Sequence, residues 1–274
     1  MAEDAAVVWF SDDACRDVEC AGGKGASLAA MTALGLPVPP GFVVPSWTLE
    51  RSVDAERLRE LAGAGAHADA EALVAAAEPP REEVLAAYAQ LGEGPVAVRS
   101  SACAEDSDTA SYAGQQETFL NVIGGDEVCR SVAACWASFF SERALFYRRQ
   151  KGALDDLRMA VVVQRMVEPK KSGVLFTVDP VQRRRDRMIV EAIYGLGEQV
   201  VSGHATPDHY VVDRNGETKR EVTPNGGVLE ASELVALAEL GRSLEERFGK
   251  PQDVEWAIAD GELFLLQSRP VTTL

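Results

Sequence analysis

Residues 253–269 read DVEWAIADGELFLLQSR, two runs of alternating polar and apolar residues on either side of Asp260-Gly261. This alternation predicts a β-hairpin with one polar and one apolar face. Because a slip of one residue would push charges into the core, the pattern selects a register, and a three-residue loop around Gly261 satisfies it. The apolar face then carries Val254, Trp256, Ile258, Phe264 and Leu266.

The polar face of this hairpin carries two cross-strand pairs. In the selected register Asp253 lies opposite Arg269, and Glu255 lies opposite Gln267. Carboxylate and amide oxygens are hard ligands that suit Mg²⁺, and an arginine beside them can bind phosphate through two parallel hydrogen bonds. The face is therefore a candidate site for a magnesium-bound polyphosphate. A solvated face with ordinary cross-strand ion pairs is the alternative.

A second candidate phosphate site lies near the N-terminus, where residues 22–28 read GGKGASL. Glycines let the backbone approach phosphate oxygens closely, and Lys24 supplies a positive charge. The pattern is not a Walker A loop, because Val18 stands where that loop needs its first glycine and Gly25 stands where it needs Ser or Thr. Two interpretations stay open: a flexible glycine turn that contacts phosphate, or a plain entry into a short helix at 28–34.

The remaining pattern mixes helical and extended segments. Residues 48–90 have helical spacing interrupted at Pro79-Pro80, and a long amphipathic helix is expected from about residue 126 to residue 150. Strands are expected at 95–100, 118–122, 159–166, 173–178, 188–193 and 209–212, and a helix at 230–248. Because many strands are adjacent along the chain, the pattern favours α+β lobes over a doubly wound parallel sheet.

The composition limits the classes of partner. The 274 residues include 27 Lys and Arg against 43 Asp and Glu, which gives a formal net charge of −16. This charge argues against a nucleic acid or an anionic membrane surface as the main partner, whereas a compact polyanion can be held by a few basic side chains and a divalent metal. Five scattered cysteines without a C-x-x-C pair, an acidic N-terminus and no long apolar run predict a cytoplasmic protein with reduced thiols.

Two polar residues interrupt strands that are otherwise apolar. Arg99 ends a Val-Ala-Val strand and opens an acidic loop, so its guanidinium can reach a phosphate or neutralise that loop. Gln164 follows three valines, and its amide can meet the edge of a purine or face solvent.

Taken in order, these and further motifs resemble the ATP-binding domain shared by phosphoenolpyruvate synthase, pyruvate phosphate dikinase and rifampicin phosphotransferase, an ATP-grasp fold. The resemblance runs nearly end to end. The matching motifs are GGKGASL at 22–28, GLPVPPGF at 35–42, VRSSA at 98–102, SYAGQQETFLNV at 111–122, CWASFFSERA at 135–144, VVVQRMV at 161–167, SGVLFTVDP at 172–180, YGLGE at 194–198, QDVEWA at 252–257 and LQSRPVT at 266–272.

The resemblance implies an α+β ATP-grasp fold of two lobes, residues 1–162 and 163–274, with the nucleotide in the cleft between them. It also implies ATP and Mg²⁺ as the ligands, and assigns residues to them. The implied ligands are Lys24, Arg99 and Arg269 at phosphate, Gly114 and Thr118 in a loop that closes over the polyphosphate, Gln164 near the adenine, and Glu255 and Gln267 at Mg²⁺ with Asp253 in support.

The activity implied is phosphoryl transfer, in which Lys24, Arg99 and Arg269 position and neutralise the phosphates. Family enzymes continue into a swivelling domain whose histidine receives the phosphoryl group, whereas none of the three histidines of this sequence lies in such a motif. We therefore expect transfer to a histidine on a separate swivelling domain or subunit, with AMP and phosphate formed overall. A free-standing kinase or ligase acting on a small molecule is the alternative, and a nucleotide sensor without turnover is a third class.

Overall fold

The computed structural model describes residues 5–103, 117–151, 154, 156–201, 203 and 205–271. The chain forms two compact units, described separately below: unit 1 comprises 1–35 and 40–166, and unit 2 comprises 36–39 and 167–274. Each unit contains an antiparallel sheet and helices, so the predicted α+β class is confirmed. The predicted lobe boundary after residue 162 falls inside strand β5 (Met159–Arg165), whereas the units divide after Met166.

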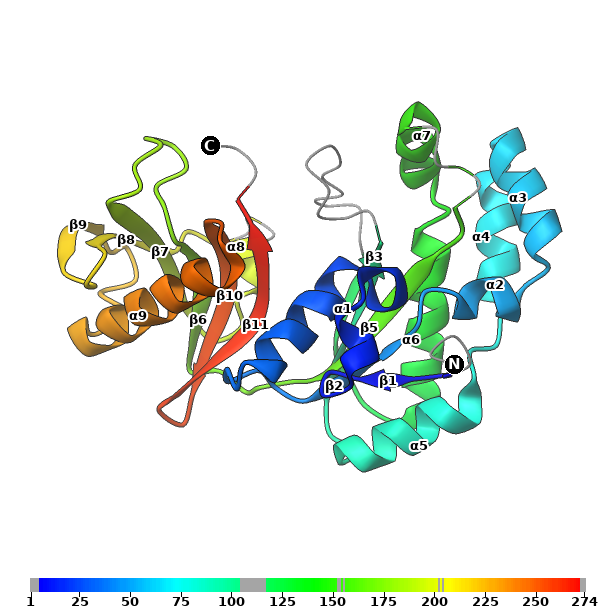
Figure 1. Cartoon of the computed structure of the whole chain (residues 1–274), viewed down its shortest axis with the longest axis horizontal. Coiled ribbons are helices and arrows are strands. Elements are labelled where there is room, and N and C mark those ends of the chain that lie inside the picture. Colours follow the sequence, from blue (N-terminus) through cyan, green and yellow to red (C-terminus); the bar gives the residue numbers. More distant parts are fainter. Residues whose placement is uncertain are drawn as a thin grey trace. The chain divides into compact units, whose positions relative to one another are not determined.

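The sheet of unit 1 has the strand order β1-β2-β5-β3-β4 (Figure 1). Its other strands are β1 (Val8–Trp9), β2 (Gly41–Val44), β3 (Val96–Ala102) and β4 (Thr118–Val122). One face buries Phe42, Val98 and Val163 in the main core cluster. The opposite face is covered by helix α1 (Val18–Ala33), whose Gly25 lies close to the side chains of Val43 and Val162.

The helices of unit 1 confirm one predicted break and add others, at 53–54 and 65–66 within the predicted 48–90 stretch and at 139–141. The interruption predicted at Pro79-Pro80 is present between α4 (His67–Ala75) and α5 (Arg81–Leu91). The single helix predicted for 126–150 is wrong, because the helix stops at Ser138 and Ser141 begins a new one, its Oγ accepting from the amide of Ala144 at 3.4 Å. The helices besides α1 are η1 (Asp13–Arg16), α2 (Thr48–Ser52), α3 (Ala55–Ala64), α4 (His67–Ala75), α5 (Arg81–Leu91), α6 (Gly125–Ser138) and α7 (Glu142–Lys151).

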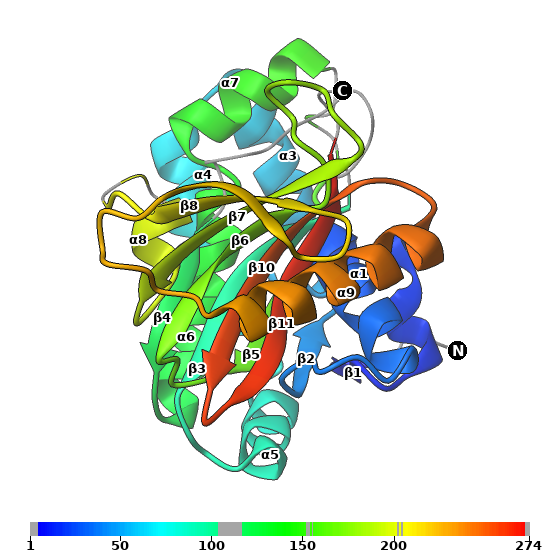
Figure 2. The ribbon, with the colours of Figure 1, turned by 90° about the vertical axis from the view of Figure 1, so that its left-hand side faces the viewer.

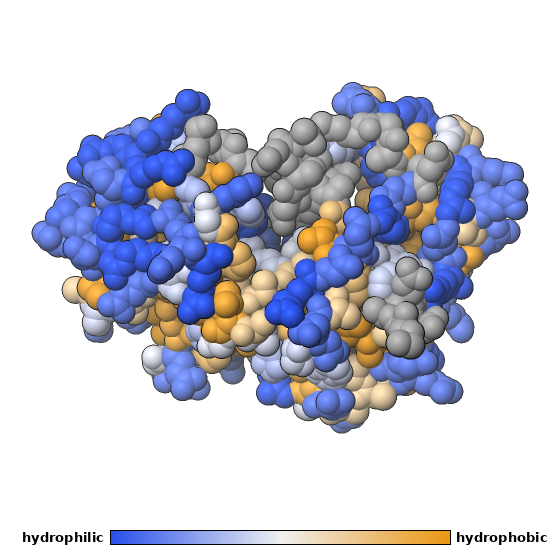
Figure 3. All heavy atoms as spheres, in the orientation of Figure 1, coloured by the Kyte–Doolittle hydropathy of each residue, from blue (hydrophilic) through white to orange (hydrophobic). Residues whose placement is uncertain are grey.

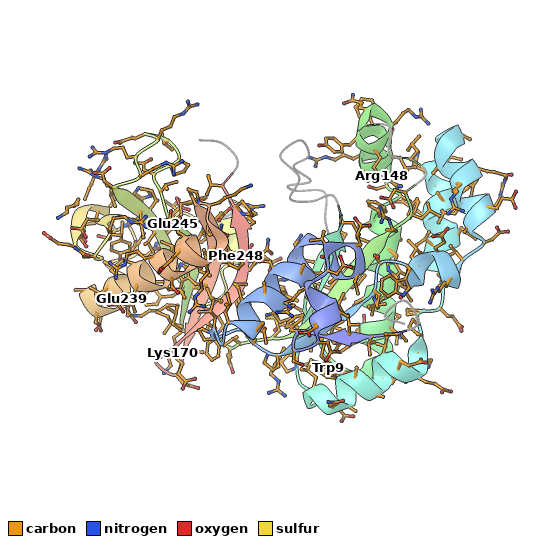
Figure 4. All side chains as sticks on the ribbon, viewed as in Figure 1. Trp9, Arg148, Lys170, Glu239, Glu245 and Phe248 are labelled. Atoms are coloured by element: carbon orange, nitrogen blue, oxygen red, sulfur yellow. The ribbon has the colours of Figure 1, made fainter. Side chains whose placement is uncertain are left out.

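Arg148 fastens α7 to the rest of unit 1 (Figure 4). Its guanidinium lies 3.9 Å from the centre of the Phe139 ring and donates to the carbonyls of Phe139 at 3.3 Å and Leu154 at 3.2 Å. The side chain is buried, and the aromatic ring and carbonyls replace the hydration that the charge loses.

The sheet of unit 2 has the order β11-β10-β6-β7-β8-β9. Helix α9 (Ala231–Phe248), predicted at 230–248, lies across one face of this sheet (Figure 2). Strand β9 was not predicted, since all five of its residues are exposed and show no apolar alternation. The elements besides α9 are β6 (Lys171–Phe176), β7 (Arg187–Tyr194), α8 (Glu198–Val201), β8 (Asp208–Asp213), β9 (Thr218–Val222), β10 (Gln252–Ala259) and β11 (Glu262–Pro270).

A close approach and a polar clamp hold α9 against its sheet. A Cβ built on Gly241 would lie 3.2 Å from both Leu175 and Thr177, so the glycine lets the helix pack closely on β6. Near the end of the helix, Glu245 accepts a hydrogen bond from the Thr177 hydroxyl at 2.7 Å and pairs with Arg214 (Figure 4). The opposite face of the sheet carries the polar side of the hairpin, which includes Asp253 and Glu255.

The predicted hairpin register is confirmed for the polar residue pairs of the candidate site. Asp253 pairs with Arg269 and Glu255 pairs with Gln267. The predicted three-residue loop is wrong, because Asp260 and Gly261 alone form the turn, both with positive φ, as a two-residue hairpin turn requires.

A bulge reconciles the confirmed register with the shorter loop. The register shifts between Glu255 and Trp256, so that Trp256 pairs with Leu265 and β11 carries one extra residue. Leu265 is therefore fully buried at the place predicted for Leu266, which is only half-buried. Likewise Leu263 lies opposite Ile258 at the place predicted for Phe264, which instead pairs with Ala257.

Asp208 holds the loop that precedes α9. Its carboxylate is fully buried and accepts hydrogen bonds from the backbone amides of Asn225 at 2.7 Å, Gly227 at 3.0 Å and Val228 at 2.7 Å. We expect Asp208→Ala to lower the free energy of unfolding by about 3 kcal/mol, because three buried amides lose their acceptor. Urea denaturation measures this loss. Asp208→Asn keeps one acceptor oxygen and should lose less, and an alanine variant as stable as the parent chain would contradict the role.

The cysteines are free thiols, four of them buried and Cys103 partly exposed, as expected for small core residues. Desolvation by burial raises the pKa of both Cys20 and Cys103 to about 11. Within the described ranges, no helix has the length and apolar character needed to cross a membrane. Hydrophilic residues predominate on the visible surface of unit 2 (Figure 3).

Candidate functional site

The glycine-rich segment lies inside α1, so both interpretations, which placed it before a short helix at 28–34, are wrong on this point. Gly22 interrupts the helix with φ 68° and ψ 174°, a conformation accessible in practice only to glycine. The chain is helical on both sides of this residue, so Lys24 lies in the first turn after the break. The amides of such a turn point toward the helix N-terminus, where anions bind favourably.

The carbonyls that the break deprives of helical partners are satisfied from other elements. The Ser46 hydroxyl donates to the carbonyl of Glu19, and the Ser46 amide donates to that of Cys20 at 2.9 Å. The Ser101 hydroxyl donates to the carbonyl of Ala21 at 2.8 Å. Because these partners are fixed in the packed sheet region, the break is a defined feature of the fold.

Three predicted nucleotide ligands lie on the same side of the unit 1 sheet. Arg99 on β3 pairs with Thr118 on β4, so their side chains share a face, and Gln164 on β5 lies on that face opposite Ala97. This is also the face that α1 covers, and α1 carries Lys24. Lys24 and Arg99 are half-buried, Thr118 is exposed and Gln164 is buried. Gly114 lies outside the described residues.

Unit 2 brings its four predicted ligands together on the sheet face opposite α9. Asp253 Oδ2 accepts a hydrogen bond from Arg269 Nε at 2.9 Å and lies 2.8 Å from Arg269 Nη2, so the two side chains form an ion pair across adjacent strands. Glu255 is half-buried beside Gln267, which is buried. A carboxylate, a carboxamide and a carboxylate–arginine pair thus share a single surface.

The electrostatics of this face favour an added cation. Burial raises the pKa of the Asp253 carboxyl above its usual value, although the Arg269 guanidinium opposes that shift. The nearby Glu255 and Glu191 carboxylates raise it further. Negative charge concentrated on a partly desolvated face is relieved when a divalent ion binds there.

Sequence reasoning missed Glu191 as a neighbour of the candidate site. On β7 it lies opposite Val174, which lies opposite Glu255, so all three side chains share one face. His209 Nδ1 lies 3.6 Å from a Glu191 carboxylate oxygen. A single glutamate inside the apolar run MIVEAIY at 188–194 was the available signal, but only the strand pairing reveals which face it occupies.

The donors on this face fit Mg²⁺. In the described part of the chain no three His, Cys, Asp or Glu side chains form a ready-made metal cluster. Mg²⁺ in nucleotide sites is held by one or two carboxylates together with phosphate oxygens and water, and the oxygens of Glu255 and Gln267 are of the chemical type that such a site uses. Asp253 is shared with Arg269 and suits a supporting role.

Comparison with known proteins places this arrangement in a family. The family model for the pyruvate phosphate dikinase AMP/ATP-binding domain matches residues 18–226 and 215–274. A protein named "Probable phosphoenolpyruvate synthase" from Archaeoglobus fulgidus is 42% identical over 315 residues, covering 98% of this chain and 42% of that protein. One of the same name from Methanothermobacter thermautotrophicus is 40% identical over 318 residues, covering 98% of this chain and 46% of that protein.

A third relative has a different name. The "Rifampicin phosphotransferase" of Streptomyces sviceus is 42% identical over 304 residues, covering 94% of this chain and 35% of that protein. Among solved structures, D-alanyl-alanine synthetase A from Vibrio cholerae matches with a TM-score of 0.39 and 12% identity, covering 91% of this chain and 58% of that chain. This chain spans less than half the length of the three relatives. Because the family model covers most of the chain and the identity is 40% or more over nearly all of it, the chain belongs to the pyruvate phosphate dikinase AMP/ATP-binding domain family.

Proposed function

We propose that this chain binds Mg-ATP and transfers a phosphoryl group from it to a histidine on a separate swivelling domain or subunit. The observation that carries the proposal is the hairpin pairing, which places Glu255 and Gln267 beside Asp253 and Arg269 on one face. In a member of an AMP/ATP-binding family, this set supplies oxygen ligands for a metal and a guanidinium for phosphate.

Unit 1 supplies the remaining phosphate contacts in this proposal. Lys24 follows the Gly22 break, where backbone amides and the lysine charge together favour an anion. Arg99 and Thr118 lie opposite each other on neighbouring strands and bind phosphate oxygens from the same sheet face. Gly114 belongs to the same proposal as part of the loop that closes over the polyphosphate, and Gln164 donates to and accepts from the adenine edge.

Both units hold the same nucleotide in this proposal, which is the ATP-grasp arrangement. When bound, Mg²⁺ neutralises the phosphate oxygens and orients the transferred group. Glu255 and Gln267 hold the ion, while Asp253 keeps the Arg269 guanidinium in place at 2.8 Å. Because phosphoryl transfer depends mainly on positioning and charge neutralisation, these contacts account for the catalytic role of Lys24, Arg99 and Arg269.

Nucleotide product analysis tests the proposal. The chain is incubated with ATP and Mg²⁺, with and without the histidine-bearing domain of a full-length relative, and the nucleotides are separated by chromatography. We expect AMP and phosphate only when that domain is present. ADP formed with a small-molecule acceptor alone would instead support a free-standing kinase or ligase. Tight ATP binding without turnover in any combination would contradict transfer and support a sensor.

A further inference from the structure

Ser101 joins two segments that carry proposed phosphate ligands. It lies on β3 two residues after Arg99, so both side chains are on the α1 side of the sheet. The Ser101 hydroxyl donates to the carbonyl of Ala21 at 2.8 Å and accepts from the amide of Gly25 at 3.2 Å. One fully buried hydroxyl therefore bridges the Gly22 break from both sides.

The fit around this hydroxyl is close. A Cβ built on Gly22 would lie 2.1 Å from the carbonyl oxygen of Ser101 and 2.3 Å from its Oγ. The backbone of the break thus packs directly on the backbone of β3, and no side chain separates them. We refer to Ala21, Gly22, Gly25 and Ser101 as the Ser101 junction.

We propose that Ser101 is a positioning residue, which fixes Lys24 relative to Arg99 through the Ser101 junction. The inference rests on the proposed function and deepens it. Lys24 lies between Gly22 and Gly25, so its backbone is held on both sides by contacts to Ser101. Arg99 lies two residues before Ser101 on the same strand, so its position relative to Ser101 is fixed by β3.

Loss of the hydroxyl has a specific consequence. In Ser101→Ala the carbonyl of Ala21 and the amide of Gly25 lose their common partner inside a buried region. The segment can recover hydrogen bonds only by shifting away from β3, and a displacement of about 1 Å at a phosphate ligand is costly for binding and transfer. Ser101→Ala removes one buried hydroxyl and adds no atom to the packed region, so we expect the fold of unit 1 to persist.

Amide exchange tests the junction without nucleotide. Selective ¹⁵N-glycine labelling of the whole chain gives the exchange rate of Gly25, with Gly173 of unit 2 as an internal reference. We expect the Gly25 amide to exchange at least about tenfold faster in Ser101→Ala, and less so in Ser101→Cys, whose thiol is a weaker partner. Ser138→Ala, which removes a hydroxyl on a different helix that donates to the Cys135 carbonyl at 2.7 Å, should leave Gly25 unchanged. Unaltered Gly25 exchange in Ser101→Ala would overturn the proposal.

Titration with ATP and Mg²⁺ then tests the positioning role. We expect Ser101→Ala to weaken ATP binding about tenfold, Ser101→Cys to weaken it less, and Ser138→Ala to bind as the parent chain does. Equal affinity of Ser101→Ala and the parent chain would refute positioning while leaving the proposed function intact. Absence of ATP binding by the parent chain would refute the proposed function. It would also refute the positioning role, whether or not the exchange experiment shows that Ser101 anchors Gly25.

Discussion

Gly22→Ala is expected to lower the free energy of unfolding by more than about 3 kcal/mol and to abolish ATP binding. The φ of 68° with ψ of 174° places this residue where alanine is strained whatever its surroundings. Its new Cβ would also lie 2.1 Å from the backbone oxygen of Ser101, which cannot move without displacing β3. Thermal and urea denaturation give the stability, and calorimetry gives the nucleotide affinity.

Gly63→Ala is the matched control for this substitution. Gly63 lies inside α3 without a positive φ, and apart from its own stretch of helix no described heavy atom lies within 4 Å of the position its Cβ would take. Alanine there should stabilise the chain by about 0.5–1 kcal/mol, because a helix interior favours alanine over glycine. If Gly22→Ala were as stable as Gly63→Ala and bound ATP normally, the account of the break in α1 would be wrong.

Glu255→Ala is expected to remove the contribution of Mg²⁺ to ATP binding while the fold persists. The side chain is half-buried on the polar face of the hairpin, and alanine is compatible with the strand, so little stability depends on it. Loss of a carboxylate ligand should lower the Mg²⁺-dependent gain in ATP affinity by about a hundredfold and abolish turnover. The measurement compares ATP affinity with Mg²⁺ and with EDTA.

Glu262→Ala provides the control for charge alone. Glu262 lies at the exposed start of β11, beside the turn and away from the Glu255–Gln267 pair. Its removal changes the net charge by the same amount and should leave the magnesium effect unchanged. A Glu255→Ala chain whose ATP affinity still rises with Mg²⁺ as in the parent chain would refute the metal assignment.

The pairing of Asp253 with Arg269 and of Glu255 with Gln267 could be predicted, because the alternation of polar and apolar residues determines which face each side chain occupies. A one-residue slip of the pairing would place Asp253 and Glu255 on the buried face and Val254 on the polar face. Only one register therefore keeps the charged side chains out of the core. The turn could not be predicted in the same way, because the bulge at Leu266 absorbs one residue without reversing the faces of the paired site residues.

The glycine-rich segment shows where sequence reasoning stops. Glycines near Lys24 predicted a turn, yet the helix continues through them because the partners of its broken hydrogen bonds come from distant residues. Ser46 and Ser101 supply these partners, and local sequence cannot indicate which distant hydroxyls will be adjacent. Glu191 was missed for a similar reason, since its place beside Glu255 depends on the pairing of three strands.

Calorimetric titration tests the proposal that residues of both units bind one Mg-ATP. The parent chain is titrated with ATP in the presence of Mg²⁺ alongside Lys24→Ala from unit 1 and Arg269→Ala from unit 2, with folding of each variant checked by circular dichroism. We expect one ATP per chain and a loss of affinity of at least about tenfold in each variant. Affinity equal to that of the parent chain in either folded variant, or no ATP binding by the parent chain, would contradict the proposal that residues of both units bind one Mg-ATP.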